Sequence, residues 1–152
     1  MVEINSIEEL EKYLGVNLSR YYPEEEIEHA GIQLNELTHN ISKLVKKADG
    51  LAIEDACKLI SLDPHLPFGK LIKSELSRSL KKSAEYIQKN DRQKIVKSTA
   101  ALLSLEFCPR ETEDYCKLIR KLGQNEVSAT IELATPQAEK SKLLMEGLGN
   151  VT

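Results

Sequence analysis

Basic side chains concentrate in the middle of the chain, and their type and spacing suggest chemistry. Residues 66–105 carry 9 basic and 3 acidic side chains, a net charge of +6, whereas residues 1–65 carry 6 and 13, a net charge of −7. At about 100° per residue, most basic residues of the helix predicted over 68–89 share the face opposite its apolar stripe, and more follow directly. The set is Lys70, Arg78, Lys81, Lys82, Lys89, Arg92, Lys94 and Lys97. Such a face suits phosphate groups, because each cation neutralises one phosphate and releases a counterion.

The same residues have a second interpretation, an ordinary solvated helix face beside an acidic N-terminal half. Aromatic residues make up only 5% of the chain, so the stacking of nucleotide bases is poorly supported. The prediction is therefore limited to phosphate contacts, with the solvated face left open as the alternative.

Histidine is the usual general base of enzymes, and the chain has three histidines. Glu26-x-x-His29 and Glu36-x-x-His39 match the spacing of di-metal carboxylate bundles, which take such pairs from two different helices. Here both pairs lie on one predicted helix, about 15 Å apart at the standard helical rise, so they cannot share a metal. We predict no catalytic residue and no metal site. A dispersed enzyme site that uses His29, His39 or His65 remains an alternative.

The cysteines and glycines give no sign of a cofactor. Cys57, Cys108 and Cys116 lack the Cys-x-x-Cys spacing of zinc sites. They are expected to be buried thiols in a reducing compartment. The glycine-rich loops that bind nucleotide phosphates are also missing from the sequence, so no cofactor is predicted.

Capping and stop residues divide the chain into about seven helices. Ser6 and Glu9 form a capping box that opens the first helix, and Gly15 closes it. Pro23 and the acids after it predict the second helix start, because proline suits the first position and acids favour the positive helix end. The predicted ranges are 6–15, 23–49, 53–62, 68–89, 90–107, a helix ending at Gly123, 126–134, and 135–147. A short strand over Val127–Leu133 is the one alternative to helix.

We therefore expect an all-α fold, a single-domain irregular bundle of about six to eight helices over residues 1–152. Residues 1–22 are open to a second interpretation, a peripheral N-terminal arm. A chain of 152 residues can bury enough surface to fold without a disulfide or a metal. No stretch reaches the 18 or so apolar residues of a membrane span, and the N-terminus lacks the features of a signal peptide. The expected location is the cytoplasm, with no membrane partner.

One heptapeptide recurs in nearly the same form. Glu-Asp-Ala-Cys-Lys-Leu-Ile occupies Glu54–Ile60, and Glu-Asp-Tyr-Cys-Lys-Leu-Ile occupies Glu113–Ile119. The flanking residues differ, and a solenoid is expected to have three or more repeats. Convergence of two amphipathic helices is therefore favoured over an internal repeat.

The stretch from Leu66 to Leu122 resembles part of the C-terminal domain of the archaeal and eukaryotic primase large subunit. Leu66–Gly69 corresponds to its apolar-Pro start, and Lys89–Lys94 corresponds to its basic link between two helices. Ala100–Leu103 lies in its Ala/Leu-rich helix, and Glu113–Arg120 forms its acidic helix. The cysteines that ligate an iron–sulfur cluster in the family are not matched. The resemblance therefore implies a cluster-free form, similar to the third, non-catalytic primase subunit of some archaea.

This resemblance implies an accessory subunit without catalytic activity alone, which joins the catalytic and large primase subunits. In the family the basic link contacts the initiating nucleotide or the 5′-triphosphate end of the primer. By position that role falls to Arg92 and Lys94, with Lys89 and Lys97 adjacent, and the implied partners include the DNA template and the RNA primer. The alternative from the residues alone is a helical protein–protein adaptor, whose basic face meets an acidic partner and which has no nucleic-acid role.

Overall fold

The computed structural model describes residues 3–25, 28–67 and 69–149, apart from the side chain of Lys70. These residues form eight α-helices, two 3₁₀ turns and no strand, so the expected all-α fold is confirmed. The α-helices are α1 (Ile7–Leu14), α2 (Ala30–Lys46), α3 (Gly50–Leu62), α4 (Gly69–Lys82), α5 (Lys89–Leu103), α6 (Thr112–Leu122), α7 (Gln124–Leu133) and α8 (Glu139–Gly149). The 3₁₀ turns are η1 (Ser19–Tyr21) and η2 (Ala84–Tyr86).

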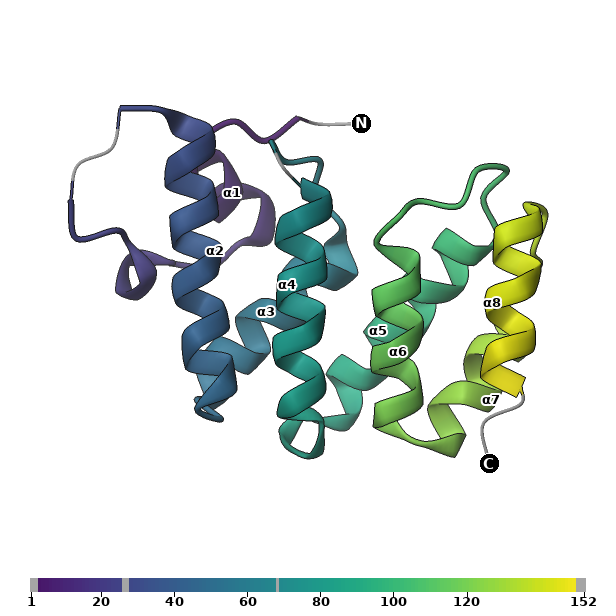
Figure 1. Ribbon diagram of the computed structural model, residues 1–152. Helices are drawn as coiled ribbons and strands as arrows, with labels where there is room; N and C mark the ends of the chain where they lie inside the picture. The colour runs from purple at the N-terminus through teal and green to yellow at the C-terminus, as the bar shows by residue number, and fades with distance from the viewer. Residues whose placement is uncertain (1–2, 26–27, 68, 150–152) are drawn as a thin grey trace.

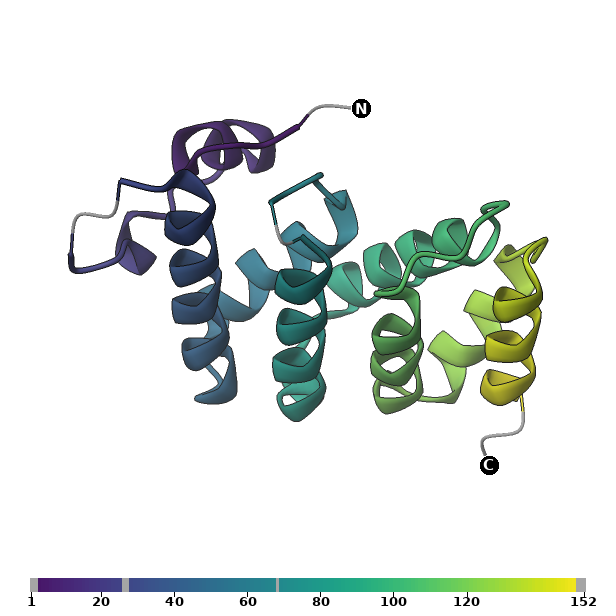
Figure 2. The same ribbon diagram turned by 45° about the horizontal axis from the view of Figure 1, so that its top comes forward.

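The helices lie in two rows. Helices α2, α4, α6 and α8 stand side by side in front, and α3, α5 and α7 lie behind them (Figures 1 and 2). The contacts between α2 and α4 give their direction: His39 Nδ1 lies 2.7 Å from Glu75 Oε1, and Ser83 Oγ donates to the carbonyl oxygen of Val45 at 2.6 Å. Residue numbers rise together across this interface, so α2 and α4 are parallel.

The rest of the front row has the same direction. Lys73 near the start of α4 lies 3.7 Å from Glu111, which precedes α6. At the other end of α6, a Cβ atom at Gly147 of α8 would lie 2.9 Å from Arg120 Nη2. All four front helices therefore bring their C-terminal ends to one edge of the row. The expected helical bundle is thus arranged as two packed rows of helices.

The N-terminal segment belongs to the core. Ile4, Leu10, Leu14 and Leu18 are at most 3% exposed. The hydroxyl of buried Tyr21 donates to Asp55 Oδ2 of α3 at 2.6 Å. Residues 3–22 thus pack against α2 and α3, the first helices of the two rows.

The first helix is where the sequence places it. Ser6 Oγ accepts a hydrogen bond from the backbone N–H of Glu9 at 3.1 Å, which is the N-cap half of the predicted capping box. Gly15 closes α1 with φ +68°, in the left-handed region that glycine occupies without steric cost.

The predicted start of the second helix at Pro23 is wrong. Helix α2 begins at Ala30, where the His29 side chain accepts from the backbone N–H of Ile32 at 3.3 Å. Asn40 Nδ2 donates to the Tyr21 carbonyl oxygen at 2.9 Å, so Tyr21 lies beside the middle of α2. From Tyr21 the chain must therefore return to the start of α2 and then reverse its direction. One continuous helix cannot make that reversal. Glu26 and Ile27 lie outside the described residues.

The predicted helix over 68–89 is too long. Helix α4 ends at Lys82, where Ser83 turns toward α2, and η2 separates it from α5. Helix α5 begins at Lys89 behind the N-cap residue Gln88, one residue before the predicted range 90–107. Residues 89–94, the basic link of the resemblance, are therefore the first turns of a helix.

The other boundaries differ less. Helix α3 starts at Gly50, and α5 stops at Leu103 where an end near Phe107 was expected. Helix α6 ends at Leu122 with Gly123 as its C-cap, as predicted, and Val127–Leu133 is helical, so the strand alternative is excluded. Among the described residues, no helix is both long and apolar enough to cross a membrane.

The recurring heptapeptides occupy unlike places in the two rows. The first copy lies in α3 of the back row, and the second lies in α6 of the front row. Their cysteines, Cys57 and Cys116, are both buried. The two copies are therefore not equivalent parts of a repeat, which agrees with convergence of two amphipathic helices.

Asp49 links the N-terminal segment to the start of α3. Its Oδ1 accepts from the backbone N–H of Ala52 at 2.9 Å, and its carboxylate receives two hydrogen bonds from the Arg20 guanidinium. We expect Asp49→Ala to lower the free energy of unfolding by about 1 kcal/mol, as is usual for loss of an N-cap, measured by urea denaturation.

Asp49→Asn is the matched control, because it keeps the cap and removes the charge. The guanidinium of Arg20 lowers the pKa of the Asp49 carboxyl below its usual 3.8. The charge-dependent stabilisation is therefore complete above that value and is lost as the pH falls through the lower folded-state pKa. Equal stability of wild type and Asp49→Ala at neutral pH would contradict this role.

Candidate phosphate-binding surface

The structure divides the predicted basic residues among three surroundings. Arg78 and Lys82 are exposed on α4 in the front row, and Lys81 is half-buried beside them. Arg92 is half-buried, and its guanidinium is bound to carbonyl oxygens of the chain. Lys89, Lys94 and Lys97 are exposed on α5 in the back row. The side chain of Lys70 lies outside the described residues. The eight residues therefore do not form one surface.

New partners join the α4 residues from the neighbouring helices. Because α2 and α4 are parallel and His39 is level with Glu75, the last turns of α2 lie beside the last turns of α4. Lys43 and Lys46 of α2 are thereby placed near the basic residues of α4. Across the next interface, Lys81 and Lys82 line a hollow of about 420 Å³ together with Lys121 of α6, and Glu85 and the occupied Arg92 also line it. We call the following set the basic edge: Lys43, Lys46, Arg78, Lys81, Lys82 and Lys121.

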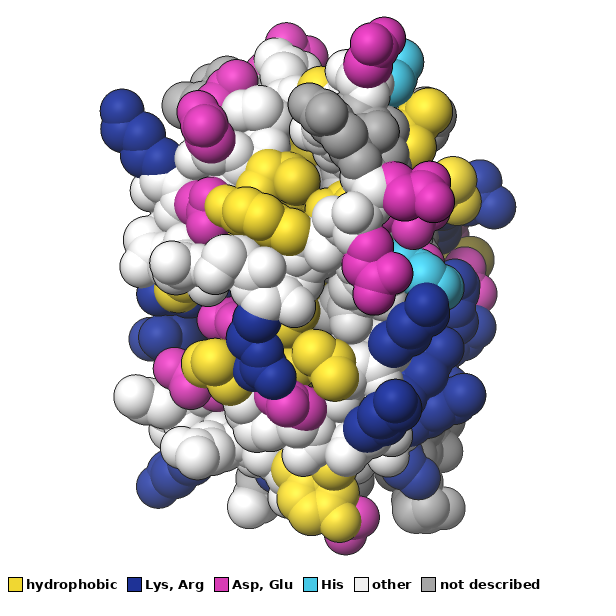
Figure 3. All heavy atoms as spheres, turned by 90° about the vertical axis from the view of Figure 1, so that its left-hand side faces the viewer, with side chains coloured by type: hydrophobic (Ala, Val, Ile, Leu, Met, Phe, Trp, Pro, Cys, Tyr) yellow, Lys and Arg dark blue, Asp and Glu magenta, His cyan; other side chains and the backbone are white. Residues whose placement is uncertain are grey.

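The basic edge is available to an external anion. None of its residues forms an ion pair within the described part of the chain, and all of them except the half-buried Lys81 are exposed. Figure 3 views the α2 end of the molecule, where Lys and Arg side chains gather on one side of the face, below Asp and Glu side chains. Cations in the last turn also stabilise helix C-termini, so part of this charge has a structural reason.

The serines of α4 are not part of this surface. Ser74 and Ser77, which helical periodicity places beside the basic residues, are 8% and 1% exposed. Both side chains are therefore buried within the described part of the molecule. Only the charged residues of this face remain accessible.

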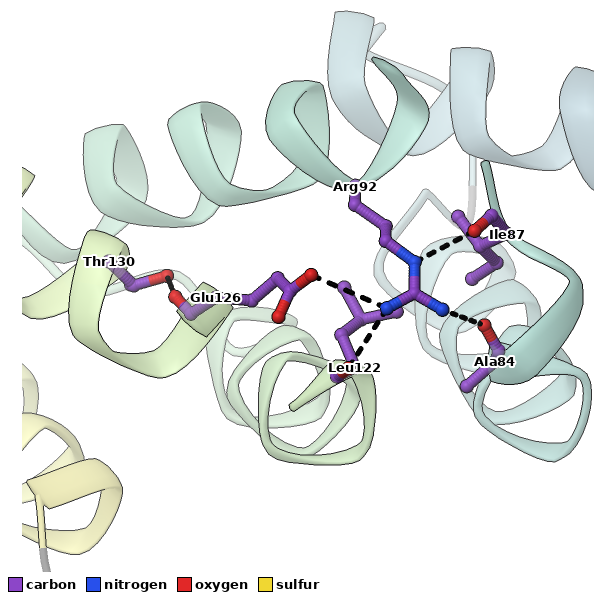
Figure 4. Close-up of polar contacts among 6 residues, drawn as sticks. All are labelled: Ala84, Ile87, Arg92, Leu122, Glu126 and Thr130. Carbon is purple, nitrogen blue, oxygen red and sulfur yellow. Dashed lines mark hydrogen bonds and ion pairs between the residues drawn. The ribbon is translucent and has the colours of Figure 1, made fainter. Parts of the chain in front are cut away.

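Arg92 has a structural role (Figure 4). Its Nε donates to the Ile87 carbonyl oxygen at 2.7 Å, and its Nη2 donates to that of Ala84 at 3.0 Å. Its Nη1 donates to the Leu122 carbonyl oxygen at 3.0 Å and pairs with Glu126 at 3.3 Å. The guanidinium thus provides hydrogen-bond donors both to carbonyl groups in and just after η2 and to a carbonyl group at the α6–α7 connection. It has little hydrogen-bonding capacity left for a phosphate.

The three histidines lie apart from one another. His29 caps α2, His39 pairs with Glu75, and His65 lies 3.9 Å from Glu3. All three are at least partly exposed, as the alternative of a dispersed enzyme site expects. No two of them meet in these contacts, and the described residues contain no cluster of three or more His, Cys, Asp or Glu that could hold a metal.

The cysteines are buried, as predicted, and none forms a disulfide. Burial raises the pKa of the Cys116 thiol to about 12 and also raises the pKa of Cys57. A thiol with a raised pKa is a poor nucleophile and metal ligand at neutral pH. These two cysteines therefore act as core residues.

Sequence reasoning missed Lys43, Lys46 and Lys121. Each lies in the last turn of its helix. The sequence indicates such a position only weakly, through basic residues shortly before the predicted end of a helix. Whether those helix ends meet depends on parallel packing of helices that are distant in sequence.

In comparisons with known proteins, the chain matches no family model, and no curated protein or solved structure is significantly similar to it. The fold and the surface define an all-helical, two-row protein with a row of unpaired cations along one edge.

Proposed function

We propose that this protein is a non-catalytic accessory subunit that binds the phosphates of a nucleic acid along the basic edge. The main support is that three parallel helices bring six cations to one edge, and none of these cations forms an ion pair within the described residues. A linear row of cations suits a polyanion better than a single small anion, because each contact releases a counterion. Phosphate contacts of this kind hold a nucleic acid in position without reading its sequence.

The enzyme that this subunit serves is, on the sequence resemblance, a DNA primase. The all-α fold is compatible with that assignment. The cysteines do not match the cluster ligands of the family, which fits its cluster-free form. The role in phosphate binding moves, however, from Arg92 to the basic edge, because the Arg92 guanidinium is already occupied. The subunit would hold template or primer phosphates while the catalytic and large subunits make the primer.

The test combines the chain with the catalytic and large primase subunits of the same organism. We expect copurification of the three subunits and a higher rate of primer synthesis with this chain than without it. Fluorescence anisotropy with a primed template compares a 5′-triphosphate with a 5′-hydroxyl primer end across a salt series. Preference for the triphosphate would place the primer end on this subunit. Failure to copurify would remove the primase assignment and leave general nucleic-acid binding in place.

The alternative is a protein–protein adaptor that uses the same cations to meet an acidic protein. This alternative predicts no measurable binding to single-stranded or duplex nucleic acid, even at low salt. That result would overturn the proposed function as a whole.

A further inference from the structure

A groove runs along the back row between α5 and α7, and none of the basic-edge residues lines it. Its volume is about 280 Å³. One wall is formed by residues spaced four apart on α5, namely Lys89, Gln93 and Lys97, and the other by residues with the same spacing on α7, namely Asn125, Ala129 and Leu133. At the helical rise, each wall is about 12 Å long. The two helices run in the same direction, because Arg92 pairs with Glu126 near their starts and the backbone N–H of Thr135 donates to Ser104 Oγ just after their ends.

One end of this channel is held by an ion pair. Arg92 Nη1 lies 3.3 Å from Glu126 Oε1, and the two side chains join α5 to α7 (Figure 4). The hydrogen bonds that the Arg92 guanidinium donates to backbone carbonyl oxygens also fix it in place. The separation of the walls is therefore set before any ligand arrives, which lowers the entropic cost of binding.

The floor of the groove is apolar, and its rim carries positively charged side chains. Val96 forms the floor and is 4% exposed, whereas Leu133 on the wall is 54% exposed although it is a large apolar residue. The lining contains three basic residues and one acidic residue. Arg92 and Glu126 neutralise each other, and neither Lys89 nor Lys97 has an ion pair within the described residues. Two free cations thus flank an apolar strip.

We propose that this groove docks an amphipathic acidic helix from a partner protein. Its apolar side chains would cover Val96 and Leu133, and two carboxylates about 12 Å apart, eight positions along a helix, would face Lys89 and Lys97. A helix placed between two parallel helices continues their ridge-into-groove packing. A nucleic acid suits the groove less well, because its walls carry no aromatic side chain for base stacking.

The test uses a fluorescein-labelled, alanine-based peptide of about 18 residues, long enough to be partly helical. It carries two glutamates eight positions apart with leucines between them on the same face. Fluorescence anisotropy is measured with the full chain. We expect saturable binding that falls about tenfold in Lys89→Gln/Lys97→Gln, and about tenfold in Leu133→Ser. Both variants change exposed side chains and should keep the wild-type melting temperature.

Matched controls separate this docking from general charge attraction. Lys94→Gln lies on α5 but does not line the groove, so it should bind the peptide as the wild type does. A peptide with glutamines in place of the two glutamates should bind about tenfold more weakly. Equal binding of both peptides, no saturation by either, or no effect of Leu133→Ser would overturn the proposal. Neutralising the basic edge should leave peptide binding unchanged, so this inference and the proposed function can fail separately.

Discussion

Replacing Arg92 with methionine is expected to lower the free energy of unfolding by about 3 kcal/mol. The substitution leaves the carbonyl groups of Ala84, Ile87 and Leu122 without their donor and Glu126 without its partner. Hydrogen bonds to a charged group contribute about 1.5–3 kcal/mol each. Solvent reaches part of this site, since the side chains of Arg92 and Glu126 are 24% and 18% exposed, so the total is well below the sum of the separate bonds.

The measurement is thermal and urea unfolding followed by circular dichroism. For a chain of this length, a loss of about 3 kcal/mol corresponds to a fall in melting temperature of roughly 6–12 °C. Lys94→Met is the matched control, because Lys94 is exposed on the same helix and has no ion pair within the described residues. Its effect should stay within about 0.5 kcal/mol. Similar unfolding of both variants would contradict the structural role of Arg92.

This prediction matters for the interpretation of binding data. The primase resemblance makes Arg92 and Lys94 the residues to change first in a test of phosphate binding. An Arg92 variant that loses binding through partial unfolding would appear to confirm a contact that the guanidinium does not make. Lys94 carries no such risk, so the two substitutions should be made and measured separately.

The sequence predicts helices well where their ends are determined locally. The N-cap at Ser6 and the stops at Gly15 and Gly123 depend on a few neighbouring residues, and all three are present in the structure. Pro23 is equally suggestive in the sequence, but the long-range contact between Asn40 and Tyr21 forces the chain to reverse before α2 begins. Tertiary contacts of this kind override local preferences and leave no local signal.

The candidate site is harder to predict than the helices, because charge counts do not show which cations remain free. Lys73 and Arg92 belong to the basic middle of the sequence. Lys73 is buried with Asp63 at 2.7 Å and Glu111 at 3.7 Å, and Arg92 is occupied by carbonyl groups. Conversely, cations outside the basic middle join the basic edge from α2 and α6. The parallel order of the front row, which brings these helix ends together, depends on contacts between helices distant in sequence.

Neutralising the basic edge is expected to produce the largest change in function. The variant Lys43→Gln/Arg78→Gln/Lys82→Gln removes three of the six cations and leaves the glutamine side chains exposed. If all six contact phosphates of a duplex, the slope of log K against log salt should be about −5, and the variant should reduce it by about 3. At about 0.1 M salt, this corresponds to a loss of roughly 100-fold or more in affinity.

The back row supplies a control with the same change in net charge, Lys89→Gln/Lys94→Gln/Lys97→Gln. If the basic edge holds the phosphates, this variant should keep nearly the wild-type salt slope, because its lysines lie on another surface of the molecule. Both proteins are measured by fluorescence anisotropy with the same labelled duplex and primed template. If only the back-row variant shows a reduced slope of log K against log salt, the phosphate site lies on α5, as the primase resemblance implies. Equal partial losses in both variants would indicate attraction by net charge without a defined site, and the basic edge would then have no special role in binding.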